Sequence, residues 1–416
     1  MTTVSGDQRV TGLADVADPG GPLTRSVGSS SPAERRPAPP FTPEHEDFRA
    51  AVRRFVATEL APKADEWEAA RWFPDSVFTR LAELGYIGLK FDPSVGGDGD
   101  PVADAVFVEE LAWCGSGGLA AGIGAHTGIA LPPIAKFGTP EQQARYLVPG
   151  IRGERIAALA ITEPGAGSDV AAISTTARPV EGGWLVSGSK QFITGGCRAR
   201  TLVTAVKTTA EGGHHGISFL IIDAGPDVPG LSTAPIEKLG WHASDTALIA
   251  FDEVFVPRAN LLGEENGGFA LIMANFQWER LLMSLGALGA MRWCFDRTLR
   301  YARERVAFGR PISAFQVTRH TFAEMAVTIQ AAEALTYEVL RRYVAGGDVV
   351  ALVTQAKLFT QRAAVDVADT CLQIHGGAGY MVEYGIERCL RDARLGPIGG
   401  GTDEIMKEIL GRTLGL

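Results

Sequence analysis

The sequence predicts an α+β protein with an N-terminal α-helical domain, a central small β-barrel or sandwich, and a C-terminal four-helix-bundle domain. Apolar residues recur at helical spacing before about residue 157 and again after about residue 265, whereas the stretch between holds short strand-like runs. A chain of 416 residues is also too long for one ordinary hydrophobic core. We therefore expect domains at 41–156, 157–265 and 266–416, after a disordered tail at 1–40.

Composition limits the classes of function. A content of 46% hydrophobic and 21% charged residues is typical of a globular protein, and no apolar run approaches the length that spans a bilayer. The formal net charge of −9 disfavours nucleic-acid binding, which usually leaves a basic footprint. The five cysteines and seven histidines show no metal-ligand spacing. We therefore expect no metal, no membrane association, and the reduced thiols of a cytoplasmic protein.

The N-terminal part begins with a tail. Residues 1–40 are rich in Gly, Pro, Ser and Arg and show no apolar period, which predicts disorder. Thr42 and Pro43 then supply the cap and first turn of a helix whose Phe48 and Val52 fall on one face. Further helical patterns, separated by Gly- or Pro-containing breaks, cover 74–84, 102–113, 117–137 and 140–147.

The central and C-terminal parts differ in their apolar period. After residue 268 apolar residues return to helical spacing, as at Phe269, Ile272 and Phe276, and long helices of this kind suggest a bundle. The strand-like runs before that point predict a small barrel or sandwich. These runs lie at 184–186, 202–206, 217–222, 248–251 and 254–257.

The stretch 161–169 lies where the pattern changes from helix to strand. Its Glu-Pro pair favours an extended or turning backbone, and two nearby glycines permit conformations closed to other residues. The backbone can then approach a flat or phosphorylated ligand closely, with Thr162 and Ser168 as polar donors. From these residues alone, a tight turn closed by Asp169 is an equally good interpretation.

A second motif decides between these interpretations. The runs ITEPGAGSDV at 161–170 and GSKQFITGG at 188–196 resemble, in order and spacing, the flavin-binding core of the acyl-CoA dehydrogenase family. The resemblance covers roughly 41–416, agrees with the predicted architecture, and implies bound FAD. Where the family usually has tryptophan this chain has Phe192, which keeps an aromatic contact with a smaller ring. The FAD contacts that the resemblance implies here are Ile161, Thr162, Gly167, Ser168, Phe192, Ile193 and Thr194.

Two later segments are similar to those that reach across a subunit interface in the family. By this resemblance Arg305 meets the FAD pyrophosphate, which suits its planar guanidinium, and Phe308 and Gln316 contact the adenosine half. Without this context Arg305 would be a solvated charge at a helix end. The glycines that close a predicted helix at 355–374 are a helix stop in their own right, and in the family they approach the FAD of the neighbouring subunit. Sharing FAD implies a homo-oligomer, usually a homotetramer, with contacts from Gln373, Gly376 and Gly377.

The catalytic base is predicted on a helix. Many family members carry a glutamate two residues before the threonine that matches Thr402, but position 400 is glycine here. A subgroup that includes isovaleryl-CoA and long-chain acyl-CoA dehydrogenases places its base on a helix, followed by arginine and leucine, and FQWERLL at 276–282 resembles that arrangement. Glu279 is therefore the predicted base; the alternatives are an ordinary surface role for it, or the weaker candidate Glu163. The resemblance also implies FAD contacts from Thr402, Asp403 and Glu404, and substrate contacts from Ser168, Gln277, Arg280, Gly400 and Gly401.

The implied reaction is FAD-dependent α,β-dehydrogenation of a fatty or branched acyl-CoA to the trans-2-enoyl-CoA. Glu279 would take the α-proton while the β-hydrogen leaves as hydride to the flavin, with the Gly400 N–H and the flavin ribityl hydroxyl polarising the carbonyl. Electrons would pass to an electron-transferring flavoprotein. The absence of side chains at 399–401 predicts room for branched or long acyl chains. An acyl-carrier-protein thioester stays open as substrate, and an acyl-CoA oxidase, a flavin monooxygenase or a catalytically silent flavoprotein binding module stays open as function.

Overall fold

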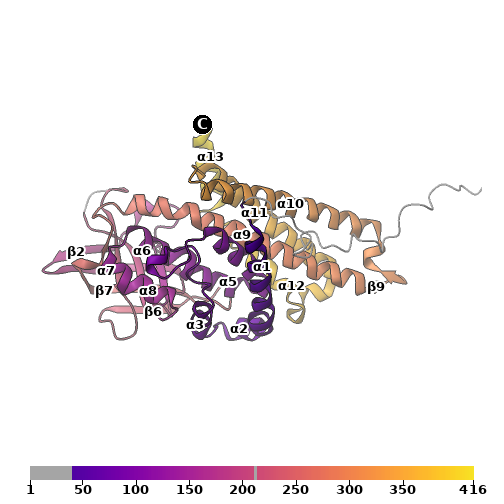
Figure 1. Ribbon diagram of the computed structural model, residues 1–416, viewed down its shortest axis with the longest axis horizontal. Helices are drawn as coiled ribbons and strands as arrows, with labels where there is room; N and C mark the ends of the chain where they lie inside the picture. Colours follow the sequence, from indigo (N-terminus) through magenta and orange to yellow (C-terminus); the bar gives the residue numbers. More distant parts are fainter. Residues whose placement is uncertain (1–39, 210–212) are drawn as a thin grey trace, which may run out of the picture. The chain divides into compact units, whose positions relative to one another are not determined.

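The computed structural model describes residues 40–209 and 213–416, so the predicted tail lies outside the described residues except for Pro40. From Pro40 onward these residues belong to one compact unit. The order of elements is helical, then sheet, then helical (Figure 1), which confirms the predicted fold class. The division into separate domains at 156 and 265 stays a prediction, because the three parts form a single compact unit.

The first part of the described chain is helical, and its first helix begins as predicted. The Thr42 hydroxyl accepts a hydrogen bond from the His45 amide at 3.4 Å, and the His45 ring accepts one from the Thr42 amide at 3.0 Å. The helices are α1 (Pro43–Phe55), α2 (Ala64–Ala70), α3 (Ser76–Glu83), α4 (Pro101–Leu111), α5 (Gly117–Gly124), α6 (Leu131–Phe137), α7 (Pro140–Gln142) and α8 (Val148–Ile151).

The segment 117–137 is helical throughout, as predicted, but it is not α-helical throughout. Between α5 and α6 the backbone widens over Ala125–Ala130 into a π-helical segment. Pro132 and Pro133 follow directly, and neither has the N–H that a continuous α-helix requires. An apolar period alone does not reveal such a change of hydrogen bonding.

The central part is an eight-stranded sheet in the order β6-β7-β3-β2-β4-β5-β8, with β1 parallel to β4. The two predicted runs at 248–251 and 254–257 are one strand, β7, because a bulge at Glu253 (φ 52°) interrupts its alternation without ending it. The strands are β1 (Ala157–Ala160), β2 (Thr176–Val180), β3 (Gly183–Thr194), β4 (Thr201–Lys207), β5 (Ile217–Asp223), β6 (Leu231–Pro235), β7 (Thr246–Pro257) and β8 (Leu261–Leu262).

The C-terminal part is a helical bundle in which α11 packs against α9, α10, α12 and α13 (Figure 1). A two-stranded hairpin, β9 and β10, separates α9 from α10. The bounds are α9 (Gly268–Glu304), β9 (Val306–Ala307), β10 (Arg310–Pro311), α10 (Gln316–Val344), α11 (Val350–His375), α12 (Ile386–Ala393) and α13 (Asp403–Thr413).

Helix α9 is packed along most of its length. Leu271 and Ile272 belong to the apolar core of the N-terminal helices, Leu281 and Leu285 to a second core with α4 and α10, and Met291 to a third within the bundle. A helix fixed in three cores gives rigid placement to the side chains on its remaining face.

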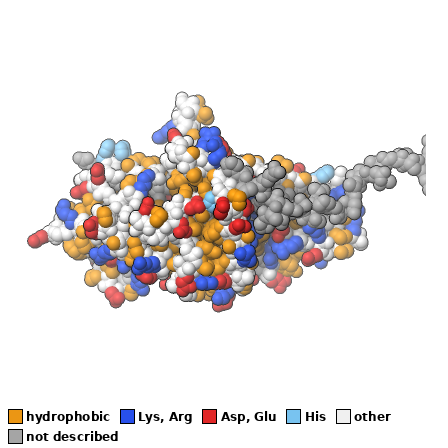
Figure 2. All heavy atoms as spheres, viewed as in Figure 1, with side chains coloured by type: hydrophobic (Ala, Val, Ile, Leu, Met, Phe, Trp, Pro, Cys, Tyr) orange, Lys and Arg blue, Asp and Glu red, His pale blue; other side chains and the backbone are white. Residues whose placement is uncertain are grey.

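The surface seen in Figure 2 mixes acidic and basic side chains, with apolar side chains gathered near the middle of the view. That face therefore carries no large field of one sign. In the described part of the chain, no helix is both long enough and apolar enough to cross a membrane.

Candidate active site

Glu279 lies near the middle of α9 and points at the glycine loop between α12 and α13. A Cβ placed on Gly400 would lie 3.6 Å from Glu279 Oε1. The carboxyl is half-buried and, among the described residues, receives no hydrogen bond. Burial raises the pKa of Glu279 to about 7, against the opposing positive charges of Arg280 and Lys357. A carboxyl with a pKa near neutrality fits a general base.

The glycine loop itself leaves donors free. Gly400 (φ 62°) and Gly401 (φ 93°) both adopt left-handed conformations that glycine allows without strain. Neither amide N–H donates a hydrogen bond within the described residues. Lys357 Nζ donates to the Gly401 carbonyl at 2.6 Å. The loop thus presents unused backbone N–H groups beside the Glu279 carboxyl.

Arg280 is buried next to the base and has no carboxylate partner. Among the described residues, its Nε–H donates no hydrogen bond, and no acidic oxygen lies within 4 Å of its guanidinium. The guanidinium lies 5.2 Å from the Phe276 ring centre, and desolvation lowers its pKa while Glu279 opposes that effect. A buried guanidinium with free donors suits an electron-rich ligand. Gln277, the other predicted substrate contact on α9, is half-buried.

Glu163 has the opposite surroundings, which removes it as a base. Its carboxylate accepts hydrogen bonds from Lys190 Nζ (2.7 Å), Ser174 N (2.6 Å), Ser174 Oγ (2.7 Å) and Thr175 N (3.0 Å). Burial favours a higher pKa, but Lys190 and the other donors outweigh it and lower the pKa of Glu163 to about 2. The same Lys190 donates to the Ile161 carbonyl at 2.9 Å. Glu163 is therefore a structural anchor of the 161–169 loop.

That anchor leaves the later part of the loop, from Gly167 onward, open to solvent. Gly167 and Ser168 are exposed, and no atom lies within 4 Å of a Cβ placed on Gly167. Ile161 and Thr162 are half-buried, and the Thr162 carbonyl accepts from the Gln191 amide at 2.8 Å. The two motifs of the sequence, 161–170 and 188–196, are therefore joined directly by hydrogen bonds.

The aromatic residue of the second motif projects from a bulge. Phe192 has a φ of 63° and is 60% exposed, at a register shift between β3 and β7. Its neighbour Ile193 is buried in the core of the sheet, and Thr194 is half-buried. Ile193 is thus closed to solvent, whereas Phe192 is more than half exposed.

The three residues at the start of α13 are used in different ways. The Thr402 hydroxyl caps the helix by accepting from the Ile405 amide at 3.3 Å. Asp403 is buried, and its carboxylate forms an ion pair with Arg362. Glu404 is exposed in the first turn. Of the three, Glu404 is the one whose carboxylate faces solvent.

The segments predicted to bind FAD across an interface all lie on the surface. Phe308 is 95% exposed at the tip of the β9–β10 hairpin, where it and Gly309 both have positive φ, as a type I′ turn requires. Figure 1 shows this hairpin at the far end of the bundle from the sheet. The predicted contacts on these segments are all exposed: Arg305, Phe308, Gln316, Gln373, Gly376 and Gly377.

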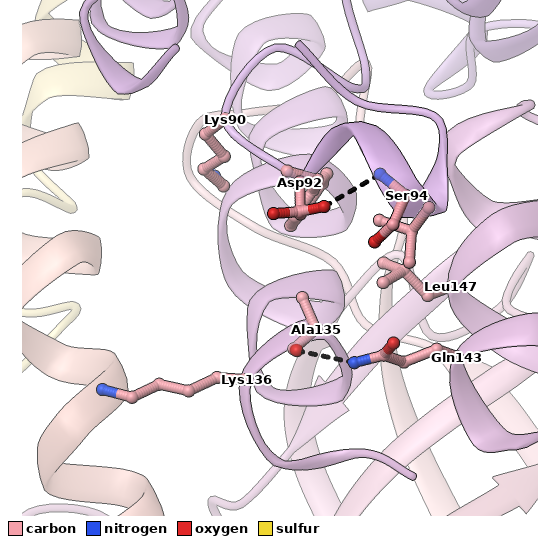
Figure 3. A pocket seen from close by; sticks show the side chains of 9 residues that line it. Lys90, Asp92, Ser94, Ala135, Lys136, Gln143 and Leu147 are labelled. Atoms are coloured by element: carbon pink, nitrogen blue, oxygen red, sulfur yellow. Dashed lines mark hydrogen bonds between the residues drawn. The ribbon is translucent and has the colours of Figure 1, made fainter. Parts of the chain in front are cut away.

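A cavity of about 370 Å³ lies elsewhere, in the N-terminal helical part (Figure 3). Three of its polar side chains have internal partners: Asp92 accepts from the Ser94 amide at 2.8 Å, Gln143 donates to the Ala135 carbonyl at 2.9 Å, and Lys90 pairs with Asp104 at 3.1 Å. None of the residues predicted for catalysis or cofactor binding lines it. The convergence of Glu279, Arg280 and the glycine loop is the better candidate.

Two features of the interior were not predicted from the sequence. Lys357 is fully buried behind the glycine loop, and the only signal in the sequence was a lone lysine within the apolar pattern of a helix.

Cys294, Cys371 and Cys389 meet from three helices, and mutual hydrogen bonding with burial raises the pKa of Cys294 well above its usual value. A buried thiol with a raised pKa, such as that of Cys294, is unreactive. In the described ranges no group of three or more His, Cys, Asp or Glu residues is arranged to hold a metal.

Comparison with known proteins identifies the family of this chain. Isovaleryl-CoA dehydrogenase, mitochondrial, from Oryza sativa subsp. japonica is 36% identical over 378 residues, which is 90% of this chain and 92% of that protein. Long-chain specific acyl-CoA dehydrogenase, mitochondrial, from Rattus norvegicus is 36% identical over 378 residues, 90% of this chain and 87% of its own. These names are those of the subgroup that the 276–282 motif resembles, so the predicted resemblance is confirmed.

A crystal structure and the family models extend the agreement. The crystal structure of acyl-CoA dehydrogenase from Geobacillus kaustophilus is 40% identical, with a TM-score of 0.88 over 91% of this chain and 100% of that one. The family models for the N-terminal, middle and C-terminal domains of acyl-CoA dehydrogenase match residues 42–154, 158–254 and 266–415. The chain therefore belongs to the acyl-CoA dehydrogenase family of oxidoreductases.

Proposed function

We propose that this protein is an FAD-dependent dehydrogenase of branched or long-chain acyl-CoA, with Glu279 as the base that removes the α-proton. The observation that carries the proposal is the Glu279 carboxyl, which is half-buried, accepts no hydrogen bond from the residues that the structure describes, and is directed at the glycine loop. The carboxylate of Glu163, the other candidate, already accepts four hydrogen bonds. Family membership supports acyl-CoA dehydrogenation as the reaction class.

Proton removal follows from the surroundings of Glu279. A pKa of about 7 gives the carboxylate a much greater proton affinity than an ordinary glutamate while leaving a useful fraction ionised at neutral pH. The α-proton of a thioester is weakly acidic, so its removal needs a strong base and a polarised carbonyl. The free N–H of Gly400 is the donor we assign to the thioester oxygen. Arg280, unpaired beside the base, is available to a further oxygen of the substrate.

The residues around the 161–169 loop fit FAD. Exposed backbone at Gly167, the Ser168 hydroxyl and the exposed ring of Phe192 form a surface for a flat, polar-edged group. When bound, FAD supplies the acceptor for the β-hydrogen and its electron pair. The exposed Arg305 and Phe308 of a second copy would hold its pyrophosphate and adenosine ends, and this proposal therefore includes a homo-oligomer, of four chains by analogy with the family.

Substrate shape is set in part at Gly400. Residues 399–401 carry no side chains, but the Met283 sulfur would lie 2.5 Å from a Cβ placed on Gly400, so this flexible side chain occupies the space beside the glycine and must move aside for a branched or long acyl chain. We expect kcat/KM for isovaleryl-CoA or palmitoyl-CoA to exceed that for butyryl-CoA. A clear preference for butyryl-CoA would remove the argument. The corresponding acyl-carrier-protein thioesters, tested alongside, show whether the CoA portion is needed.

The experiment that tests the function is anaerobic reduction of the protein-bound flavin by a panel of acyl-CoA thioesters. We expect the flavin to bleach and the trans-2-enoyl thioester to form, with an electron-transferring flavoprotein as acceptor for turnover. Rapid reoxidation by oxygen with turnover would instead show an oxidase. No bleaching by any thioester, in protein that contains flavin, would contradict the proposal.

A further inference from the structure

Lys357 is a buried cation directly behind the proposed active site. It lies on α11 with 0% exposure, and its Nζ donates to the Gly401 carbonyl at 2.6 Å. No carboxylate of the described residues lies within 4 Å of this ammonium. Burying an ammonium without a direct carboxylate partner is costly, because its hydration is lost. Buried charges with such a free-energy cost are found most often where the charge has a functional role.

The hydrogen bond from Lys357 is the one that holds the glycine pair. Among the described residues, neither Gly400 nor Gly401 makes another hydrogen bond through its amide or carbonyl. The loop is tied on either side, by Gly399 N to Leu395 O at 2.9 Å and Asp403 N to Pro397 O at 3.0 Å. Two consecutive glycines with positive φ have no side chains to pack, so without this bond their backbone would sample several conformations.

The charges around Lys357 come from three helices. Glu279 and Arg280 belong to α9, Arg362 to α11 itself, and Asp403 to α13. Asp403 is already paired with Arg362. Glu279 has no hydrogen bond, and its Oε1 lies 3.6 Å from the Cβ position of Gly400. The glycine pair therefore contacts the ammonium through Gly401 and lies beside the base at Gly400.

We propose that Lys357 is a positioning residue for the reaction: its ammonium holds the Gly400–Gly401 backbone beside Glu279 and, across that backbone, its charge stabilises the Glu279 carboxylate. This inference rests on the proposed role of Glu279 as base. It assigns to one side chain both the placement of the Gly400 N–H and part of the electrostatic balance of the base.

The direction of the electrostatic effect is fixed by the surroundings. Desolvation lowers the pKa of Lys357 to about 8, with Asp403 and Glu279 acting in the other direction, so the side chain is largely a cation at pH 7. Its charge lowers the pKa of Glu279, which burial raises to about 7. Removal of the charge must therefore raise the pKa of Glu279 further.

Two substitutions separate the two effects. Lys357→Met removes the donor and the charge, whereas Lys357→Gln removes the charge and retains an N–H donor. Difference infrared spectra of the flavin-containing protein over a pH series would show the protonated carboxyl of Glu279, identified by its absence in Glu279→Gln. We expect its titration midpoint to rise by about one pH unit in both variants.

The rate of anaerobic flavin reduction supplies the second readout. For Lys357→Met we expect a fall of about 10- to 100-fold, the usual loss when a positioned group is released, with flavin content unchanged. For Lys357→Gln we expect a smaller fall. Arg341→Met is the matched control, because it removes one cation from the exposed surface of α10, where Arg341 pairs with Glu338. It should leave both the midpoint and the rate unchanged.

The outcomes distinguish this inference from the proposed function. The infrared titration needs no thioester, so a raised midpoint supports the role of Lys357 even if no acyl-CoA reduces the flavin. Wild-type reduction that depends on Glu279, together with a folded Lys357→Gln or Lys357→Met whose midpoint and rate equal those of the wild type, would overturn it.

Discussion

Glu163 and Glu279 are two glutamates largely withdrawn from solvent whose carboxyls differ by about five units in pKa. Glu163 is 4% exposed, faces Lys190 and accepts four hydrogen bonds, which lower its pKa to about 2. Glu279 accepts none within the described residues, and burial raises its pKa to about 7. Desolvation acts in the same direction on both, so the donors decide the sign.

The difference shows how one residue type serves stability in one place and chemistry in another. A carboxylate that accepts hydrogen bonds from several donors holds a loop in place and has a low affinity for a proton. A carboxyl kept without donors costs stability, yet it accepts a proton near neutral pH. Each of the following predictions tests one side of this contrast.

The largest effect is expected from Glu279→Gln. The substitution keeps size and deletes only the proton acceptor, so flavin reduction by acyl-CoA should slow by several powers of ten, on the order of 4 kcal/mol or more in the barrier. Flavin content and thioester binding should persist. Stopped-flow absorbance under anaerobic conditions measures the rate. A near-normal rate would place the base elsewhere.

Glu163→Gln should damage stability instead of chemistry. It leaves the buried ammonium of Lys190 without its counter-charge, and breaking a buried pair in this way typically costs about 3–5 kcal/mol. Denaturant unfolding measures the loss, and flavin should also dissociate more readily because the 161–169 loop loses its anchor. Glu253→Gln, in an exposed pair with Arg178 on the same sheet, is the control and should cost at most about 1 kcal/mol. Equal effects of the two changes would refute the anchor.

Glu279→Gln should also stabilise the protein, and only above acid pH. The folded-state pKa of about 7 exceeds the usual 4.5, so the folded state binds more protons between these values. The cost of ionising Glu279 is absent below about pH 4.5, grows up to about pH 7 and is constant above it. At about 1.4 kcal/mol per unit, the variant should gain up to about 3 kcal/mol at pH 8 and nothing at pH 4. A pH-independent difference in melting temperature would contradict this.

The smallest effect concerns the loop position that many relatives use. In the Glu279→Gln background, Gly400→Glu alone should restore nothing, because its Cβ would lie 2.5 Å from Met283 Sδ and φ is 62°. Adding Met283→Ala removes the obstruction. We then expect recovery of roughly tenfold, about 1.4 kcal/mol, over the Glu279→Gln rate. Recovery without the Met283 change would show that the methionine moves aside freely.

Much of the architecture was predictable because it depends on local signals. Thr42 and Pro43 mark a helix start that the structure confirms, and the apolar periods separate helical from strand-forming regions. The π-helical segment within 117–137 was not predictable, since a stretch this short is too brief for its apolar period to reveal the changed hydrogen-bond partners. Strands β2 and β6, which are largely exposed, lack the apolar runs that marked β3, β4, β5 and β7.

Residues of the candidate site could be predicted from the sequence only where they belong to a recognisable motif. The resemblance at 276–282 selected Glu279, but no local pattern distinguishes a glutamate with four donors from one with none. That difference arises from tertiary contacts, such as Lys190 reaching Glu163 from another strand. Lys357 was missed for the same reason, since its partner Gly401 lies 44 positions away in the chain. The roles of the predicted cofactor residues stay predictions.

The central claim is that a desolvated, donor-free Glu279 is the base, and the pH dependence of flavin reduction tests it most directly. The second-order rate constant for anaerobic reduction by isovaleryl-CoA at low concentration reports ionisations of the free enzyme. We predict that it rises with pH through an inflection near 7, in line with the pKa of Glu279, and that Glu279→Gln abolishes the inflection. A rate that is independent of pH in this range, or an inflection that survives in Glu279→Gln, would contradict the claim.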